Sequence, residues 1–348
     1  MIFISIASYR DNELYPTIVD LVKNAAHPHE LNIAVCWQDE EDLSQFELKG
    51  ITFSPSWKTN SFPVYRAQFM GATLFIINMH FTQSAGTGFA RYLCETLYNN
   101  EQYFLQIDSH CRFTTGWDEE MIGILESLRK QSDKPMLSTY PPDYQPGKPE
   151  QRASFTSRLI FKRFMDDGIS LQDSCPMQAS EPQRNCYLAG GFVFADGHYV
   201  RNVPNDPQVF FYGEEISMAV RAYTHGYDAY TPHKILLWHH YGRSGSPKVW
   251  DDHTDHAKVK GLVTHTWFER DHVSKQRVRA VLGLGEPLKD IYGCGSSRSL
   301  ADFTRASGLC FQTRQVHPDV KGQKRCSYFE NHRETDESWL ECFIPADE

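Results

Sequence analysis

A cluster of potential metal ligands stands at residues 108–110 of this chain. A mostly apolar run at positions 103–107 leads directly into Asp108, Ser109 and His110. This pattern is typical of a buried strand, and in α/β sheets ligands bind at the carboxyl ends of such strands. An aspartate and a histidine two residues apart can reach one cation, and a carboxylate oxygen with an imidazole nitrogen suits Mn²⁺ or Zn²⁺ better than Ca²⁺. The same pattern also occurs by chance where a strand is followed by a polar loop. The rest of the sequence is therefore needed to distinguish a metal site from such a loop.

Two histidines form the second candidate group. His239 and His240 follow an apolar stretch at 235–237 and precede an aromatic residue, a glycine and Arg243. Successive strand residues point to opposite faces, so we expect only one of the two histidines to face a site. If one of them joins the first group, the protein supplies three ligands and leaves positions for phosphate oxygens and water. The alternative is that one histidine lies at the surface and the other lies in the core, where its ring nitrogens have hydrogen-bond partners.

Acids and glycines near two predicted helix starts are further candidates. Glu214 and Glu215 follow a glycine, and the helix dipole favours acids in a first turn, which explains at least one of them. The other could contact a substrate near its reacting atom. Gly86 and Gly88 could admit a diphosphate, although their spacing matches neither G-x-G-x-x-G nor a P-loop. Arg91, about one turn further on, could face a phosphate or pair with a nearby acid.

The end of the first predicted strand is a candidate nucleotide site. Ala7, Ser8, Tyr9 and Arg10 occupy the turn where a base or ribose sits in a doubly wound sheet. Asp11 follows them, and capping of the next helix explains it without any ligand.

Hydrophobic periodicity predicts the elements that carry these residues. Expected strands cover 2–8, 31–37, 51–53, 103–108, 136–140 and 229–239, and expected helices cover 14–25, 89–98, 117–130, 214–225 and 272–282. The apolar segment 69–81 could be either. Strands and helices alternate in the first half of the chain, which predicts a mainly parallel central sheet with helices on both faces. The segment 141–184 is rich in Pro, Gln, Asp and Ser and predicts long loops over or beside the site.

Composition narrows the class of protein. The 348 residues are 41% hydrophobic and 23% charged, and no apolar run approaches the ~20 residues of a membrane span. The first six residues predict a core strand rather than a signal peptide. The net charge of −9 argues against a nucleic-acid partner. The nine cysteines are scattered and form no C-x-x-C, which favours reduced thiols in a cytoplasmic protein.

Three segments together resemble the polypeptide N-acetylglucosaminyltransferases, in particular the cytosolic family that attaches α-linked GlcNAc to hydroxyproline of a ubiquitin-ligase adaptor. They are I-F-I-S-I-A-S-Y-R-D, G-T-G-F-A-R-Y-L and Y-F-L-Q-I-D-S-H-C-R-F-T-T-G-W-D. A more distant similarity is to the polypeptide N-acetylgalactosaminyltransferases. The shared features are the D-S-H, an A-G-G before a strand, an acid-rich helix start after glycine, and a late His followed by an aromatic and a basic residue. The resemblance covers about residues 1–310.

The resemblance implies a Rossmann-like GT-A fold, a UDP-GlcNAc donor, dependence on Mn²⁺ or another divalent cation, and retention at the anomeric carbon. It also implies a DxH metal site of Asp108 and His110 with His239 as third ligand, because His-x-aromatic matches His239 better than His240. The acceptor would be a Ser, Thr or hydroxyproline hydroxyl of a protein. The transferase domain would span 1–300, with acceptor-side loops at 141–185 and a packed extension at 301–348.

The resemblance further implies roles for the remaining candidates. Donor binding would involve Ala7, Ser8, Tyr9, Arg10, Arg91, Asp108, Gly190 and Gly191, and catalysis would involve Glu214, Glu215 and Arg243. Front-face attack, in which the leaving phosphate takes the acceptor's proton, is favoured over a covalent intermediate on Glu214 or Glu215.

Three other functions stay open at this point. The acceptor could be a glycan or a small molecule, and the protein could bind a nucleotide sugar without turnover. A metal hydrolase is the third, because residues 251–256 are dense in Asp and His, although they lack the H-E-x-x-H pattern of zinc proteases.

Overall fold

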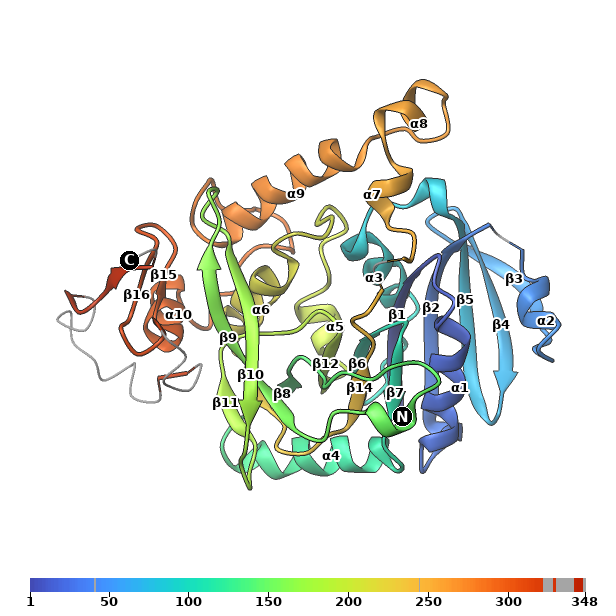
Figure 1. The fold of residues 1–348 in the computed structure, drawn as a ribbon, viewed down its shortest axis with the longest axis horizontal. Helices are drawn as coiled ribbons and strands as arrows, with labels where there is room; N and C mark the ends of the chain where they lie inside the picture. The colour runs from blue at the N-terminus through green and yellow to red at the C-terminus, as the bar shows by residue number, and fades with distance from the viewer. Residues whose placement is uncertain (41, 244, 322–327, 330–340, 347–348) are drawn as a thin grey trace.

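The centre of the fold is a ten-stranded sheet within the described part of the chain (Figure 1). The structure is a computed structural model, and it describes all residues except 41, 244, 322–327, 330–340 and 347–348. The strands lie in the order β11-β13-β8-β12-β6-β1-β2-β5-β4-β3. Their bounds are β1 Ile2–Tyr9, β2 Leu31–Asp39, β3 Ser54–Thr59, β4 Phe62–Phe69, β5 Ala72–His80, β6 Tyr103–Asp108, β8 Pro135–Ser138, β11 Gln183–Asn185, β12 Phe192–Asp196 and β13 Asp228–Thr231.

Strand direction confirms the predicted sheet at its centre. β1 pairs in parallel with both β2 and β6, β2 with β5, and β13 with β8. β12 runs antiparallel between β6 and β8, so β13, β8, β6, β1, β2 and β5 all share one direction. Ala7 lies opposite Asp108 in the β1–β6 register. The carboxyl ends of these two strands therefore meet at one edge of the sheet, which is where the sequence predicted ligand binding.

Helices cover both faces of the sheet because β1 is apolar on both of its sides. Ile2, Ile4 and Ile6 pack in one buried cluster with apolar residues of α1 (Leu14–Asn24) and α4 (Trp117–Ser127). Phe3 points the other way and belongs to a second cluster with apolar residues of α3 (Thr87–Glu95) and α6 (Glu214–Thr224). Continuous burial of successive residues is the expected pattern of a parallel strand that is covered on both faces.

Two predicted segments differ from the structure near the site. The expected strand 229–239 is interrupted after Thr231 by Pro232, which has no amide hydrogen for the ladder. Its second half is β14 (Leu237–His239), which pairs antiparallel with β7 (Cys111–Phe113). The expected long loops at 141–184 contain an antiparallel hairpin of β9 (Thr156–Phe164) and β10 (Ser170–Met177).

Other boundaries differ less. The expected strand at 51–53 is wrong, since β3 begins at Ser54, and the open segment 69–81 contains strand β5. The helix expected at 272–282 begins earlier, because Thr266 caps it and Glu269 completes the capping box. The remaining elements are α2 Ser44–Glu47, α5 Tyr199–Asn202, α7 Val249–Asp252, α8 Asp255–Val259, α9 Trp267–Val281, α10 Leu300–Ser307, β15 Leu309–Cys310, β16 Gln315–Val316 and β17 Ile344–Pro345.

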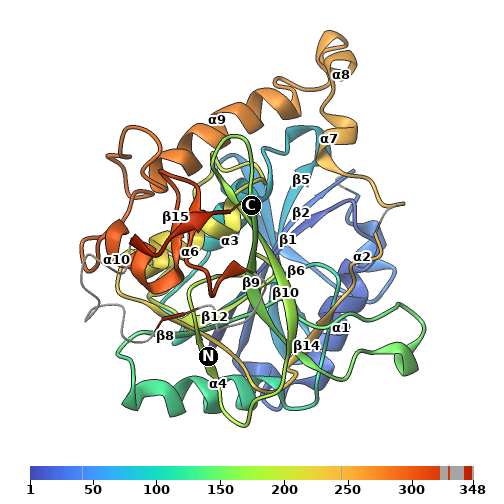
Figure 2. The ribbon, with the colours of Figure 1, turned by 60° about the vertical axis from the view of Figure 1, so that its left-hand side comes forward.

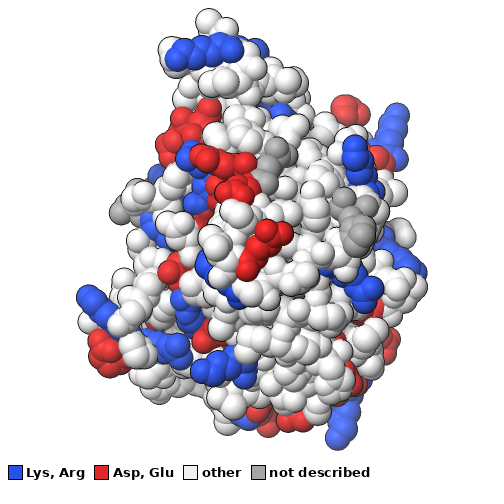
Figure 3. All heavy atoms as spheres, turned by 90° about the vertical axis from the view of Figure 1, so that its right-hand side faces the viewer, with Lys and Arg blue, Asp and Glu red and all other residues white. Residues whose placement is uncertain are grey.

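The C-terminal element lies at the end of the molecule opposite β3 and β4 (Figures 1 and 2). It consists of α10 and the small sheet β15-β16-β17, and Phe303 and Phe311 join the buried cluster beneath α6. On the face at the β3 and β4 end, acidic and basic side chains are mixed among the residues drawn (Figure 3). No helix in the described residues is both long and apolar enough to cross a bilayer.

Candidate active site

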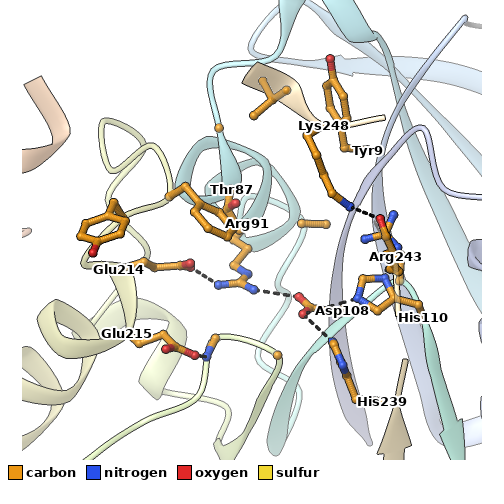
Figure 4. A pocket seen from close by; sticks show the side chains of 18 of the residues that line it. Tyr9, Thr87, Arg91, Asp108, His110, Glu214, Glu215, His239, Arg243 and Lys248 are labelled. Carbon is orange, nitrogen blue, oxygen red and sulfur yellow. Dashed lines mark hydrogen bonds and ion pairs between the residues drawn. The ribbon is translucent and has the colours of Figure 1, made fainter. Parts of the chain in front are cut away.

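A cavity of about 510 Å³ opens at the carboxyl ends of β1 and β6 (Figure 4). Its walls are the start of α3, the start of α6, the first residues of β10, the segment after β14, and α7. Its volume lies within the ~300–1,000 Å³ range of small-molecule sites. The cavity therefore has the size and the position in the sheet that a nucleotide-containing ligand requires.

Three potential metal ligands converge on this cavity. Asp108 ends β6, His110 follows two residues later, and His239 ends β14. The β7–β14 register places His239 opposite Cys111, directly beside the D-S-H segment. Asp108 Oδ2 lies 3.1 Å from His239 Nε2 and 3.9 Å from His110 Nε2. The backbone pairing of two short strands thus brings together ligands that are far apart in the sequence.

The chemistry of these three side chains fits a divalent cation. One ligand atom from each of Asp108, His110 and His239 lies within 4.8 Å of the others, and no other such group of three occurs among the residues that the structure describes. One carboxylate oxygen with two imidazole nitrogens is a donor set that suits Mn²⁺ or Zn²⁺. His240 does not join them, because its Nδ1 lies 3.2 Å from the Tyr144 carbonyl.

Arg91 is a buried cation between two carboxylates. Its guanidinium donates to Asp108 Oδ1 at 3.0 Å and forms a second ion pair with Glu214 (Figure 4). Burial tends to raise the pKa of Asp108, but the His239 hydrogen bond and the Arg91 charge outweigh burial and hold that pKa well below its usual range. Asp108 is therefore ionised and oriented before any cation arrives.

Glu215 is held by three donors from separate parts of the chain. It accepts hydrogen bonds from the Gly190 amide at 2.9 Å, from Gln172 Nε2 at 3.2 Å and from the Tyr140 hydroxyl. Burial raises the pKa of Glu215. Because Gln172 belongs to β10, this carboxylate connects the β9–β10 hairpin to the floor of the cavity.

The candidate nucleotide residues at the end of β1 are only partly in the cavity. Ala7 and Tyr9 line it, whereas Ser8 and Arg10 are not among the lining residues. Arg10 Nη1 donates to Asp252 of α7 at 2.9 Å, and the Tyr9 hydroxyl donates to the same carboxylate at 2.7 Å. These bonds hold α7 against the end of β1.

The glycines separate into two kinds. A Cβ at Gly191 would lie 2.7 Å from Asp108 Oδ2, and one at Gly190 would lie 2.9 Å from Arg91 Nη1, so both glycines make room for site side chains. A Cβ at Gly86 or Gly88 would instead collide with the backbone of residues 206–210. Gly86 and Gly88 therefore accommodate that segment of the protein, and Gly86 also lines the cavity, so a close approach of a diphosphate to these glycines stays a prediction.

Basic groups line the cavity near the three potential metal ligands. Arg243 Nη2 lies 3.1 Å from Asp11, and Lys248 Nζ donates to the Arg243 carbonyl at 3.1 Å (Figure 4). Burial lowers the pKa of Lys248. Sequence reasoning singled out Arg243 but missed Lys248 and Tyr140, since neither lies in a motif and only long-range folding brings them to the cavity.

The Asp- and His-rich residues 251–256 do not form a second metal site in the structure. Asp252 pairs with Arg10, Asp251 caps the backbone amide of Lys248, and His253 Nε2 lies 3.0 Å from the Phe81 carbonyl. These residues instead attach α7 to its neighbours.

Comparisons with known proteins identify a family by sequence and a related fold by structure. The sequence matches the family described as glycosyltransferase (GlcNAc) over residues 1–48 and 44–313. The chain is similar in structure to GalNAc-T7, crystallised with UDP, GalNAc and Mn²⁺, at 14% identity and a TM-score of 0.51 over 85% of this chain and 55% of that chain. It is also similar to residues 1–349 of S. aureus TarS, at 8% identity and a TM-score of 0.44 over 69% of this chain and 60% of that one. A comparison with curated protein sequences finds no match.

The structural likeness concerns the fold. This chain spans little more than half the length of the GalNAc-T7 chain and 60% of the TarS fragment. At 14% identity, the likeness to GalNAc-T7 shows a shared architecture, which is of the GT-A type. The predicted fold class is confirmed.

Proposed function

Because the chain belongs to the glycosyltransferase (GlcNAc) family, we propose that it is a metal-dependent retaining transferase that moves GlcNAc from UDP-GlcNAc to a protein hydroxyl. The observation that carries this proposal is the convergence of Asp108, His110 and His239 in a cavity at the ends of β1 and β6. GalNAc-T7, which shares the fold, was crystallised with UDP, GalNAc and Mn²⁺. We propose UDP-GlcNAc as the donor and Mn²⁺ as the cation on these grounds and on the sequence resemblance.

In this proposal, different residues of the cavity contact the nucleoside and the diphosphate of the donor. Ala7 and Tyr9, at the end of β1, are the proposed contacts of the nucleoside. The three metal ligands, with Arg243 and Lys248 nearby, face the diphosphate. A bound divalent cation would offset the negative charge that grows on the departing diphosphate. Arg243 and Lys248 stabilise the same charge, which is worth most in a cavity that excludes water.

Arg91 has a different role from Arg243 in this proposal. Its two amino groups are already committed to Asp108 and Glu214, so its charge balances those carboxylates and keeps them in place. Gly190 and Gly191 let the backbone approach this ion-paired group closely. The donor sugar would lie beside them, between the diphosphate and the start of α6.

The partners of the two glutamates favour front-face attack. Glu214 Oε1 is paired with Arg91, and Glu215 accepts from three protein donors, so both carboxylates are held in place by charge and hydrogen bonds, which makes them weaker nucleophiles. In the proposed step the bond between the anomeric carbon and the β-phosphate oxygen breaks. The acceptor hydroxyl bonds to the same face of that carbon, and its proton passes to the departing phosphate. Configuration is then retained without a covalent enzyme intermediate.

The acceptor side of the proposed site is the wall formed by Tyr140, Tyr241 and the β9–β10 hairpin. Leu171 and Gln172 of β10 line the cavity, and Phe211 and Tyr241 are about half exposed at it. We propose a Ser, Thr or hydroxyproline side chain as the acceptor, within a transferase domain of residues 1–300. The proposed extension 301–348 packs on this domain through its described residues, and 322–327, 330–340 and 347–348 lie outside them. A cytoplasmic location is proposed with it, because Cys36, Cys94 and Cys111 are buried free thiols.

The experiment that tests the proposal is UDP release from a panel of UDP-sugars, each with Mn²⁺ and with EDTA. Many transferases slowly hydrolyse their donor, so no acceptor is required. The expected result is release from UDP-GlcNAc that needs the metal, followed by GlcNAc addition to hydroxyl-containing peptides of a random library. No release from any donor, together with tight binding of UDP, would contradict transferase activity and favour a nucleotide-sugar-binding module.

A further inference from the structure

Asp11 connects the first helix to the candidate metal site. Its carboxylate side chain is 3% exposed, and its two oxygens face different partners. Oδ1 accepts the Glu13 amide at 3.0 Å, which is the turn that starts α1. Oδ2 lies 2.8 Å from His110 Nδ1 and 3.1 Å from Arg243 Nη2, and it accepts the Ser109 hydroxyl at 2.5 Å. The sequence suggested that Asp11 caps the helix, but the N-cap of α1 is Glu13, and Asp11 instead forms the turn before it, which explains only the first oxygen.

The contact with His110 decides which ring nitrogen can bind a cation. A carboxylate only accepts hydrogen bonds when it is ionised, so His110 must carry its proton on Nδ1 to donate to Asp11. Nε2 then has a free lone pair, and it is the nitrogen that faces Asp108 Oδ2. Metal-binding histidines commonly donate their other N–H to a carboxylate in this way, which fixes the tautomer and the ring orientation.

We propose that Asp11 is a positioning residue for metal binding, which holds His110 with Nε2 directed at the cation and restrains Arg243 beside it. The inference rests on the proposed function and deepens it, since it names the residue that prepares the site before the donor binds. Ser109 supports the arrangement, because its hydroxyl bond keeps Oδ2 turned toward His110. The two oxygens of Asp11 thus have separate roles, one in the fold and one in the site.

This separation allows a variant that removes one role only. Asp11→Ser keeps a short side-chain oxygen that can accept the Glu13 amide, because serine forms the same kind of turn as aspartate. The serine side chain is too short to reach His110 as well. Asp11→Asn keeps one acceptor oxygen, which can accept from His110 or from the Glu13 amide but not from both, and it loses the negative charge. The matched control is Asp118→Asn, because Asp118 is a buried carboxylate that accepts the amides of Ala26 and His27, both at 2.8 Å, and contacts no proposed ligand.

The test measures Mn²⁺ affinity directly, by the electron paramagnetic resonance signal of free Mn²⁺ in the presence of UDP. A carboxylate that accepts the other N–H of a metal-binding histidine typically contributes ~10–100-fold to metal affinity, so Asp11→Ser should weaken binding by about that factor. Asp11→Asn should weaken it less, and Asp118→Asn should bind like the wild type even if its urea midpoint falls. Equal affinity of Asp11→Ser, Asp11→Asn and wild type would overturn the role of Asp11. Absence of Mn²⁺ binding by the wild type would instead refute the proposed function itself.

Discussion

Replacing Gly191 with alanine should damage the proposed metal site without damaging the fold. Gly191 does not have the positive φ that would exclude a side chain, so the backbone can accept alanine. The added Cβ would lie 2.7 Å from Asp108 Oδ2 and 3.2 Å from its Cγ, whereas real Cβ atoms essentially never come within 3.0 Å. The carboxylate must therefore retreat by at least 0.3 Å, the difference between these two distances.

Asp108 has little freedom to make that movement. Arg91 holds one of its oxygens at 3.0 Å and His239 the other at 3.1 Å. Metal–ligand distances in proteins hold to about ±0.2 Å, so a shift of this size moves the carboxylate outside the bonding range of a cation placed by the two histidines. We expect Gly191→Ala to lose about tenfold or more in Mn²⁺ affinity, which corresponds to ~1.4 kcal/mol of binding free energy.

The assay is Mn²⁺ titration with urea unfolding as a parallel measurement. Gly123→Ala is the matched control, because its Cβ meets nothing within 4 Å and the residue lies within α4. That control should leave Mn²⁺ affinity unchanged and stabilise the helix by up to ~1 kcal/mol. Wild-type Mn²⁺ affinity in Gly191→Ala would refute the reasoning, because it would mean that Asp108 either moves freely or is not a ligand.

Three further predictions concern buried charge and the cavity walls. Burial raises the pKa of Glu95 from its ordinary 4.5 to about 7, so the folded protein keeps a proton that the unfolded chain has lost. The free energy of unfolding therefore falls as pH rises. Measured by urea titration relative to Glu95→Gln, it should drop by ~3 kcal/mol between pH 4.5 and about pH 7, the two pKa values. A difference between the two proteins that does not change with pH would contradict this. Arg243→Ala should weaken UDP binding about tenfold or more, as loss of a charge-assisted hydrogen bond does, and unchanged affinity by calorimetry would remove Arg243 from the site. Glu215→Gln should keep UDP release within about tenfold of wild type; a loss of a thousandfold or more would show that Glu215 takes part in the chemistry.

The parts of the site that follow local rules could be predicted from the sequence. A mostly apolar run marks β6 as a buried strand, and Asp108 and His110 follow at its end. The glycine before Glu214 and the acids after it mark the start of α6, which begins at the predicted residue. These features depend on a few neighbouring residues, so the pattern alone is sufficient.

The remaining features depend on contacts between distant parts of the chain. Nothing near His239 indicates that β14 pairs with β7, although this register brings His239 to the other ligands. Asp11 lies 99 residues before His110, and its local context is that of an ordinary helix start. The β9–β10 hairpin did carry a signal, since Asp167-Gly168 is a favoured turn sequence, but the polar composition around it predicted loops.

The most direct test of the account compares two adjacent histidines. Metal-dependent UDP release from UDP-GlcNAc should be lost in His239→Ala and largely retained in His240→Ala, because only His239 lies with Asp108 and His110. Both variants should still bind UDP in the absence of metal, which confirms that the cavity is intact. Equal rates of Mn²⁺-stimulated release by the two variants would contradict the three-ligand site on which the proposed function depends.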